Sequence, residues 1–162
     1  MSSGIGVISR TLVLGTLNKY RWVQIGSAIS HPDQGKVIDM NESIRAETGV
    51  VDAEVKIYPN SGYGNPMLLR QIMQLEKPDM IMIYTDPRFW IWFFNLEQEL
   101  RQTIPIIYLN VWDSSPACIW NRPYYSSCDL LACISKQTYG LTREVLGKGN
   151  YIELDDILKK SK

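Results

Sequence analysis

The sequence carries almost no excess charge of either sign. Lys and Arg together number 17, and Asp and Glu together also number 17, so the formal net charge is zero. A neutral chain creates no long-range field that would attract a nucleic-acid backbone or an anionic membrane surface. We therefore expect no nucleic-acid partner.

Cysteine and histidine are scarce. The three cysteines, Cys118, Cys128 and Cys133, stand at spacings that match no zinc site, and His31 is the single histidine. One histidine without a neighbouring cysteine or second histidine does not make a metal site. We expect reduced, structural thiols, no metal centre and no cofactor.

Long hydrophobic runs are also missing. The most apolar region, residues 80–96, is interrupted at residues 85–88, which leaves pieces far shorter than the ~20 residues that a membrane-spanning helix needs. The first residues lack the basic region and apolar stretch of a secretory signal. We expect no transmembrane segment and a cytoplasmic protein.

The chain has 162 residues, 45% of them hydrophobic, which suits one domain with its own core. Apolar runs typical of strands occur at residues 21–29, 36–40, 53–58, 79–84, 105–111 and 129–134. Helical patterns occur at residues 7–18, 66–76, 87–102, 121–127 and 135–146. This alternation predicts an α/β fold with a Rossmann-like parallel sheet flanked by helices over residues 1–150, followed by a polar tail over residues 151–162.

Two glycines near the start predict a ligand-binding loop. Ser3, Gly4 and Gly6 precede a helical pattern, and such a loop can present backbone N–H groups to a phosphate or a sugar. The alternative is an ordinary tight turn. In doubly wound folds this loop follows a first strand. Here that strand is either lost or lies upstream, and another chain could complete the sheet.

Two aspartates follow predicted buried strands, where open α/β sheets place their ligands. Asp86 and Asp113 could accept hydrogen bonds from sugar hydroxyls or act as a base. Carboxylates at such positions also cap helices, and Asp86 followed by Pro87 suits that role.

Aromatic side chains gather in the same loops. Trp112 and Trp120 flank a loop containing Ser114, Ser115 and Pro116, and their rings could stack on a sugar. His31 lies in another loop, at residues 31–35, and a lone histidine in a loop more often has no special role.

Three segments in order resemble the N-terminal, acceptor-side half of retaining GT-B glycosyltransferases. They are residues 3–7 (SGIGV), residues 77–83 (KPDMIMI) and residues 124–136 (YYSSCDLLACISK). The resemblance covers most of the chain. Family members commonly carry His-Asp where this chain has Trp112-Asp113.

The resemblance implies transfer of a sugar from a nucleotide-sugar to a glycan or other hydroxyl acceptor. Taken together with the positions described above, the resemblance favours a catalytic role for Asp113 and substrate contacts for Ser3, Gly4, Gly6, His31, Asp86, Trp112 and Trp120. The family's donor-binding domain, with two glutamates separated by seven residues, has no counterpart in this sequence. Transfer would then need a separate donor-binding domain. A homo-oligomer is a further possible assembly.

Two other interpretations stay open. A non-catalytic Rossmann-like binding or assembly module would use the exposed aromatics at a protein interface. A single nucleotide-binding domain would need a complete phosphate-binding loop, and the sequence has neither G-x-x-x-x-G-K-[ST] nor a full G-x-G-x-x-G.

Overall fold

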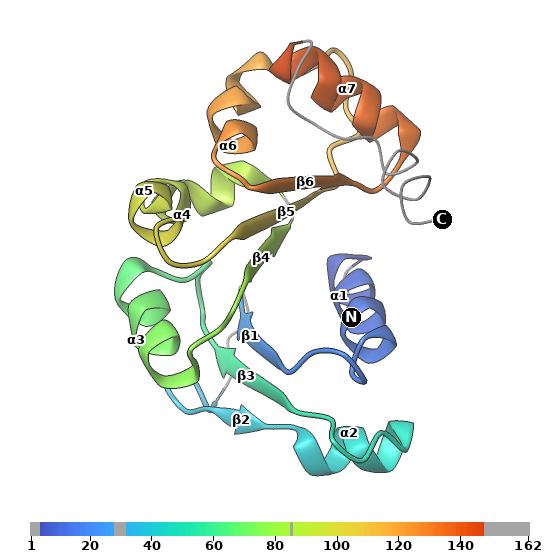
Figure 1. Ribbon diagram of the computed structural model, residues 1–162, viewed down its shortest axis with the longest axis vertical. Coiled ribbons are helices and arrows are strands. Elements are labelled where there is room, and N and C mark those ends of the chain that lie inside the picture. The colour runs from blue at the N-terminus through green and yellow to red at the C-terminus, as the bar shows by residue number, and fades with distance from the viewer. Residues whose placement is uncertain (1–3, 28–31, 85, 148–162) are drawn as a thin grey trace. The chain divides into compact units, whose positions relative to one another are not determined.

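The computed structural model describes residues 4–27, 32–84 and 86–147, and these residues form a mixed α/β structure (Figure 1). Contacts along the chain group it into two compact units, unit 1 at Met1–Glu76 and unit 2 at Lys77–Lys162. Each unit has its own three-stranded sheet. The predicted mixture of helices and strands is therefore confirmed, while the single domain over residues 1–150 stays a prediction.

The described residues of unit 1 form a mixed sheet and three helices. Its strands are β1 (Trp22–Gly26), β2 (Ile38–Asp39) and β3 (Val55–Pro59), in the order β1-β3-β2. Strand β1 is parallel to β3, and β2 is antiparallel to it. The helices are α1 (Gly4–Gly15), α2 (Asn41–Thr48) and α3 (Pro66–Glu76).

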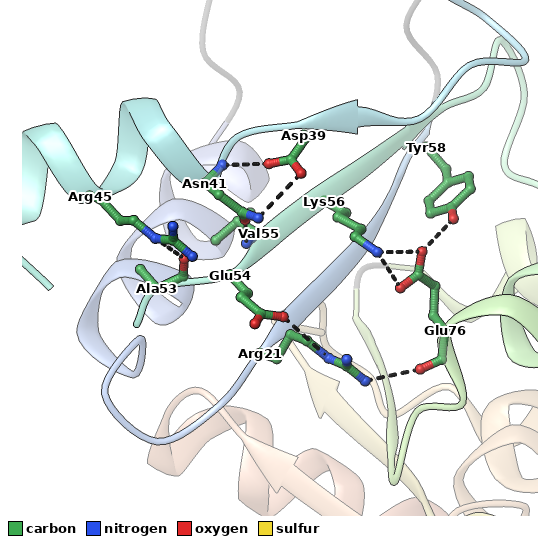
Figure 2. Close-up of polar contacts among 10 residues, drawn as sticks. All are labelled: Arg21, Asp39, Asn41, Arg45, Ala53, Glu54, Val55, Lys56, Tyr58 and Glu76. Carbon is green, nitrogen blue, oxygen red and sulfur yellow. Dashed lines mark hydrogen bonds and ion pairs between the residues drawn. The ribbon is translucent and has the colours of Figure 1, made fainter. Parts of the chain in front are cut away.

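The alternation of side chains along β3 divides the helices between two faces of this sheet. Val55 is buried in an apolar cluster with Val13 and Leu17 from the α1 region and Ile44 from α2. Its neighbour in sequence, Lys56, points the other way, towards Glu76 at the end of α3 (Figure 2). Helices α1 and α2 therefore cover one face and α3 covers the other.

Helix α2 is an element that the sequence pattern did not predict. It is short and polar, and of its residues only Ile44 is buried. Side chains tie it to the sheet: Asn41 Oδ1 accepts a hydrogen bond from the Val55 N–H at 2.7 Å, and Arg45 Nε donates to the Ala53 carbonyl at 2.9 Å (Figure 2). Side-chain hydrogen bonds to the main chain thus hold a helix that has almost no apolar face.

Unit 2 contains the sheet that the sequence predicted most clearly. Its strands, β4 (Ile81–Tyr84), β5 (Ile106–Asn110) and β6 (Leu130–Cys133), are parallel and adjacent in chain order. The 3-10 helices are η1 (Pro87–Trp90) and η2 (Ile119–Asn121), and the α-helices are α4 (Ile91–Phe94), α5 (Glu97–Leu100), α6 (Arg122–Ser126) and α7 (Lys136–Leu146). Three strands with helical connections flanking them match the predicted alternation in this part of the chain (Figure 1).

Aromatic rings form much of the core of unit 2. Tyr108 on β5 is fully buried, and its ring contacts Phe94 and Tyr125 at centroid distances of 6.3 and 5.8 Å. Burial raises the pKa of the Tyr108 hydroxyl far above its usual range. Strand β5 is therefore the buried centre of this sheet.

Two local predictions were wrong. The predicted loop at Gly4 and Gly6 is the first turn of α1, and a side chain at Gly4 would meet no atom within 4 Å. Burial of Val13 anchors that helix, and each further turn adds hydrogen bonds that outweigh the low helix propensity of glycine.

The predicted helix at residues 87–102 is instead η1, α4 and α5 in succession. The adjacent residues Phe93 and Phe94 are both buried. Both residues belong to α4, so this short helix buries a face wider than a single row of side chains.

Candidate functional site

The carboxyl edge of the unit 2 sheet is the candidate site. Tyr84 pairs with Leu109, and Asn110 pairs with Cys133, so the three parallel strands end side by side. The residues that follow these strands must therefore lie at one edge. They include Asp86, Trp112 and Asp113, three of the residues that the sequence predicted.

Asp86 caps the 3-10 helix η1, as its sequence context suggested. Its Oδ1 accepts a hydrogen bond from the Arg88 backbone N–H at 2.9 Å. Arg88 Nε lies 3.0 Å from both carboxylate oxygens, and Arg88 Nη2 donates to Oδ2. The carboxylate is therefore fully engaged by one arginine.

This engagement decides what Asp86 can do chemically. Hydrogen bonds from the Arg88 side chain hold the pKa of Asp86 below its usual range, outweighing the opposite effect of burial. A carboxylate with a lowered pKa is a poorer proton acceptor near neutral pH. Asp86 is thus suited to positioning Arg88 rather than to acting as a base.

Arg88 connects the loop after β4 to the loop after β5. Its guanidinium carbon lies 5.7 Å from the centroid of the Trp112 ring, a cation–π distance. Trp112 is itself held by two hydrogen bonds. Its backbone N–H donates to Asn110 Oδ1 at 3.0 Å, and its Nε1 donates to the Ser114 carbonyl at 3.1 Å.

Asp113 differs from Asp86 in its exposure and in its hydrogen-bond partners. Its side chain is exposed, and among the residues that the structure describes no hydrogen bond or ion pair engages its carboxylate. Its main chain is fixed, because Gln137 Nε2 on α7 donates to the Asp113 carbonyl at 2.9 Å. The site therefore presents a held backbone and an accessible carboxylate.

A buried polar network beneath these loops was not predicted. Asn110 is almost fully buried. Its Nδ2 donates to Thr142 Oγ1 at 2.8 Å, and its Oδ1 accepts from the Trp112 N–H and, at 3.4 Å, from Tyr125 Oη. Asn121 Nδ2 in turn donates to Tyr125 Oη at 3.2 Å. The network fixes where the loop between β5 and α6 begins and ends.

Besides Trp112, which is two residues away, the partners Tyr125 and Thr142 lie 15 and 32 residues from Asn110 in sequence. The one local signal was an asparagine ending an apolar strand pattern, a position where a buried amide must find partners.

The remaining predicted residues fall into three groups. Trp120 lies in η2 with 68% of its surface exposed, next to the network residue Asn121. Gly4 and Gly6 lie in α1 of unit 1. Ser3 and His31 lie outside the described residues. The carboxyl edge of unit 2 therefore brings together Asp86, Trp112 and Asp113.

Asp129, which belongs to the segment resembling glycosyltransferases, lies at the opposite edge. Its Oδ2 accepts from the Ile106 N–H at 2.8 Å, and its Oδ1 accepts from Arg101 Nη2 at 2.9 Å. These hydrogen bonds, led by that from Ile106, lower the pKa of Asp129. Asp129 therefore stabilises the start of β5.

The described residues hold no group of three or more His, Cys, Asp or Glu side chains that could bind a metal ion. The three cysteines are free thiols, and burial raises the pKa of the Cys128 thiol to about 12.

Of the helices within the described ranges, none combines the length and apolar character needed to cross a membrane.

Comparison of the sequence with protein-family models and with curated proteins, and of the structure with solved structures, finds no match. The residues at this edge are therefore the basis for assigning a function.

Proposed function

We propose that the carboxyl edge of unit 2 binds a sugar-bearing acceptor, and that the chain is the Rossmann-like acceptor side of a GT-B glycosyltransferase. The contrast between two carboxylates carries this proposal. Asp86 is engaged by Arg88, whereas Asp113 is exposed on a held backbone beside Trp112. One carboxylate orients a cation while the other stays available to a ligand hydroxyl.

The proposed reaction uses Asp113 as the general base. Asp113 accepts the proton of an acceptor hydroxyl, and the hydroxyl oxygen forms a bond to the anomeric carbon of the donor sugar. The bond between that carbon and the donor phosphate oxygen breaks, and the nucleoside diphosphate leaves with the electron pair. A separate donor-binding domain supplies the nucleotide-sugar.

The two tryptophans have different roles in this proposal. One face of Trp112 is beside Arg88, so its ring supports the guanidinium. Trp120 is 68% exposed and is better placed to stack on a sugar ring. The buried network from Asn121 to Asn110 links the backbone around Trp120 to the turn that leads to Asp113.

A non-catalytic interaction module is the second candidate. Apolar side chains exposed by 44 to 68% occur in the loops of the same edge: Phe89, Ile119, Trp120 and Ile134. Such a group also suits a protein partner. This module would bind a protein and give no response to saccharides.

Indole N–H signals in NMR spectra separate the two candidates. Adding oligosaccharides should shift the signals of Trp112 and Trp120, while those of Trp22, Trp90 and Trp92 serve as internal controls. Saccharides that leave all five signals unchanged at millimolar concentrations would contradict the proposal.

Activity is tested by mixing the chain with donor-binding domains and a panel of nucleotide-sugars. Asp113→Asn should lower kcat/KM by about 100-fold or more, the usual contribution of a general base. Asp52→Asn, an exposed aspartate in unit 1, is the matched control and should leave kcat/KM unchanged. Equal activity of Asp113→Asn and the unmodified chain would remove Asp113 from the mechanism.

A further inference from the structure

The Arg88 guanidinium has one edge bound to Asp86 and one edge that is free to bind a ligand. Its guanidinium contacts Asp86 through Nε and Nη2, the side-on arrangement. Among the described residues, nothing accepts a hydrogen bond from Nη1. The arginine side chain is 60% exposed. The outer edge of the guanidinium, with two parallel N–H groups, is therefore open to solvent.

This outer edge is held in a fixed orientation. Asp86 holds the inner edge of the guanidinium, and the Trp112 ring lies 5.7 Å from its central carbon. Asp86 is in turn fixed by accepting the Arg88 backbone N–H. An arginine oriented in this way loses less conformational entropy when it binds a ligand than a freely moving side chain does.

We propose that the outer edge of Arg88 binds an oxyanion, so that the acceptor is a sugar carrying a phosphate or carboxylate group. This inference rests on the proposed function, because it assumes that a sugar binds at this edge. A guanidinium has donors only, in a planar fork that matches two oxygens of one oxyanion. Sugar hydroxyls do not match that fork as well.

The charged side chains around Arg88 nearly cancel one another. Arg88 faces Asp86, and Asp113 follows the Trp112 that the guanidinium covers. Lys136 is exposed at the start of α7, beside the Gln137 that binds the Asp113 carbonyl. Two cations and two carboxylates balance, so the selectivity comes from directed hydrogen bonds rather than from a positive field.

Calorimetric titration with three monosaccharides tests this inference: glucose 6-phosphate, glucuronate and glucose. We expect at least one anionic sugar to bind about tenfold or more tightly than glucose, as a charge-assisted bidentate contact would provide. Preference for the phosphate or for the carboxylate identifies the class of acceptor. Inorganic phosphate should compete with the preferred anionic sugar.

Variants assign the preference to Arg88. Arg88→Gln should abolish the difference between charged and neutral sugars, and Arg88→Lys should retain part of the difference because lysine keeps the charge but not the fork. Arg143→Gln, an exposed arginine late in α7, is the matched control and should preserve the full difference. Circular dichroism and thermal melting confirm that each variant is folded.

Each result has a distinct meaning. Equal binding of glucose and both anionic sugars, unaffected by Arg88→Gln, overturns the oxyanion inference and leaves the proposed function intact. A preference for anionic sugars that survives in Arg88→Gln also overturns it. Failure of all three sugars to bind the unmodified chain overturns the inference together with the proposed sugar site.

Discussion

Glu76 is a buried carboxylate with a complete set of partners. Its side chain is 8% exposed and lies 2.8 and 3.0 Å from Lys56 Nζ, while Tyr58 Oη donates to it at 2.7 Å (Figure 2). These hydrogen bonds, led by that from Lys56, lower the pKa of Glu76 although burial opposes them. Burial, reinforced by the same carboxylate, raises the pKa of Tyr58 to about 12. Glu76 therefore holds the end of α3 against β3.

Replacing this carboxylate should destabilise the chain at neutral pH. Removing one partner of a buried ion pair costs about 3–5 kcal/mol. Lys56 remains 32% exposed, so we expect Glu76→Gln to lower the free energy of unfolding at pH 7 by about 2–3 kcal/mol. Urea denaturation monitored by circular dichroism measures the difference.

The same comparison has a predictable pH dependence. Glu76 has a lower pKa in the folded state than in the unfolded state. Its contribution to the free energy of unfolding is therefore fully present above the unfolded-state pKa of about 4.3. This contribution is lost as the pH falls through the lower folded-state pKa. The unmodified chain and Glu76→Gln should therefore converge in stability below about pH 4. A difference that stays constant down to pH 3 would show that packing, not charge, causes the effect.

Glu54→Gln is the matched control for this prediction. Glu54 is 45% exposed and approaches Arg21 only to 3.9 Å. Exposed pairs of this kind contribute about 0–1 kcal/mol. The control should stay close to the unmodified chain across the same pH range, and a loss as large as that of Glu76→Gln would contradict the argument from burial.

Single residues were predictable from sequence where the signal was local. Asp86 before Pro87 indicated a helix cap, and Asn65 before Pro66 has the same local pattern at the start of α3. Both caps are present, since Asn65 Oδ1 accepts from the Leu68 N–H at 3.0 Å. Contacts between distant loops carry no such signal. The stacking of Arg88 on Trp112 therefore emerged only from the structure.

At the scale of elements, Asp129 links the starts of two strands. It precedes β6, accepts a hydrogen bond from the first residue of β5 and pairs with Arg101 at the end of α5. A charged acceptor for a backbone N–H contributes about 1.5–3 kcal/mol when buried and less when exposed. Asp129 is 37% exposed, so its contribution belongs at the lower end of that range.

Asp129→Ala should lower the free energy of unfolding by about 1–2 kcal/mol and speed amide exchange at Ile106. Hydrogen exchange followed by NMR tests the local effect, and urea denaturation tests the global one. Asp79→Ala is the matched control, because Asp79 is an exposed aspartate that precedes strand β4 in the same way. Unchanged exchange at Ile106 in Asp129→Ala would show that this hydrogen bond does not hold β5.

Elements with continuous apolar runs were predicted best. Residues 79–84, 105–111 and 129–134 contain β4, β5 and β6, because parallel strands require buried side chains on both faces. Helix α2 was missed because Ile44 alone is buried in it. On α3, Leu75 is 64% exposed, while its charged neighbour Glu76 is buried. A pattern of apolar residues cannot predict that a charged residue such as Glu76 is buried.

At the scale of the whole molecule, the two sheets differ in what they offer a ligand. Unit 1 pairs β2 antiparallel to β3, whereas all strands of unit 2 are parallel. Only a parallel sheet gathers the loops after every strand at one edge. This difference explains why the candidate residues that the structure brings together all belong to unit 2. The sequence predicted the strands but not their division into two three-stranded sheets.

The balance of charge over the whole chain gives the last prediction. With 17 basic and 17 acidic residues, the chain has no net charge to release counterions from a polyanion. The proposed oxyanion contact uses one arginine that is already paired with Asp86. We therefore expect a fluorescent single-stranded oligonucleotide to bind no tighter than about 10⁻⁴ M at physiological salt, the weak limit of non-specific binding. Fluorescence anisotropy measures this directly. Micromolar binding that weakens steeply between 50 and 200 mM salt would instead indicate several contacts to phosphates. Such a result would reveal a basic surface and favour a nucleic-acid partner.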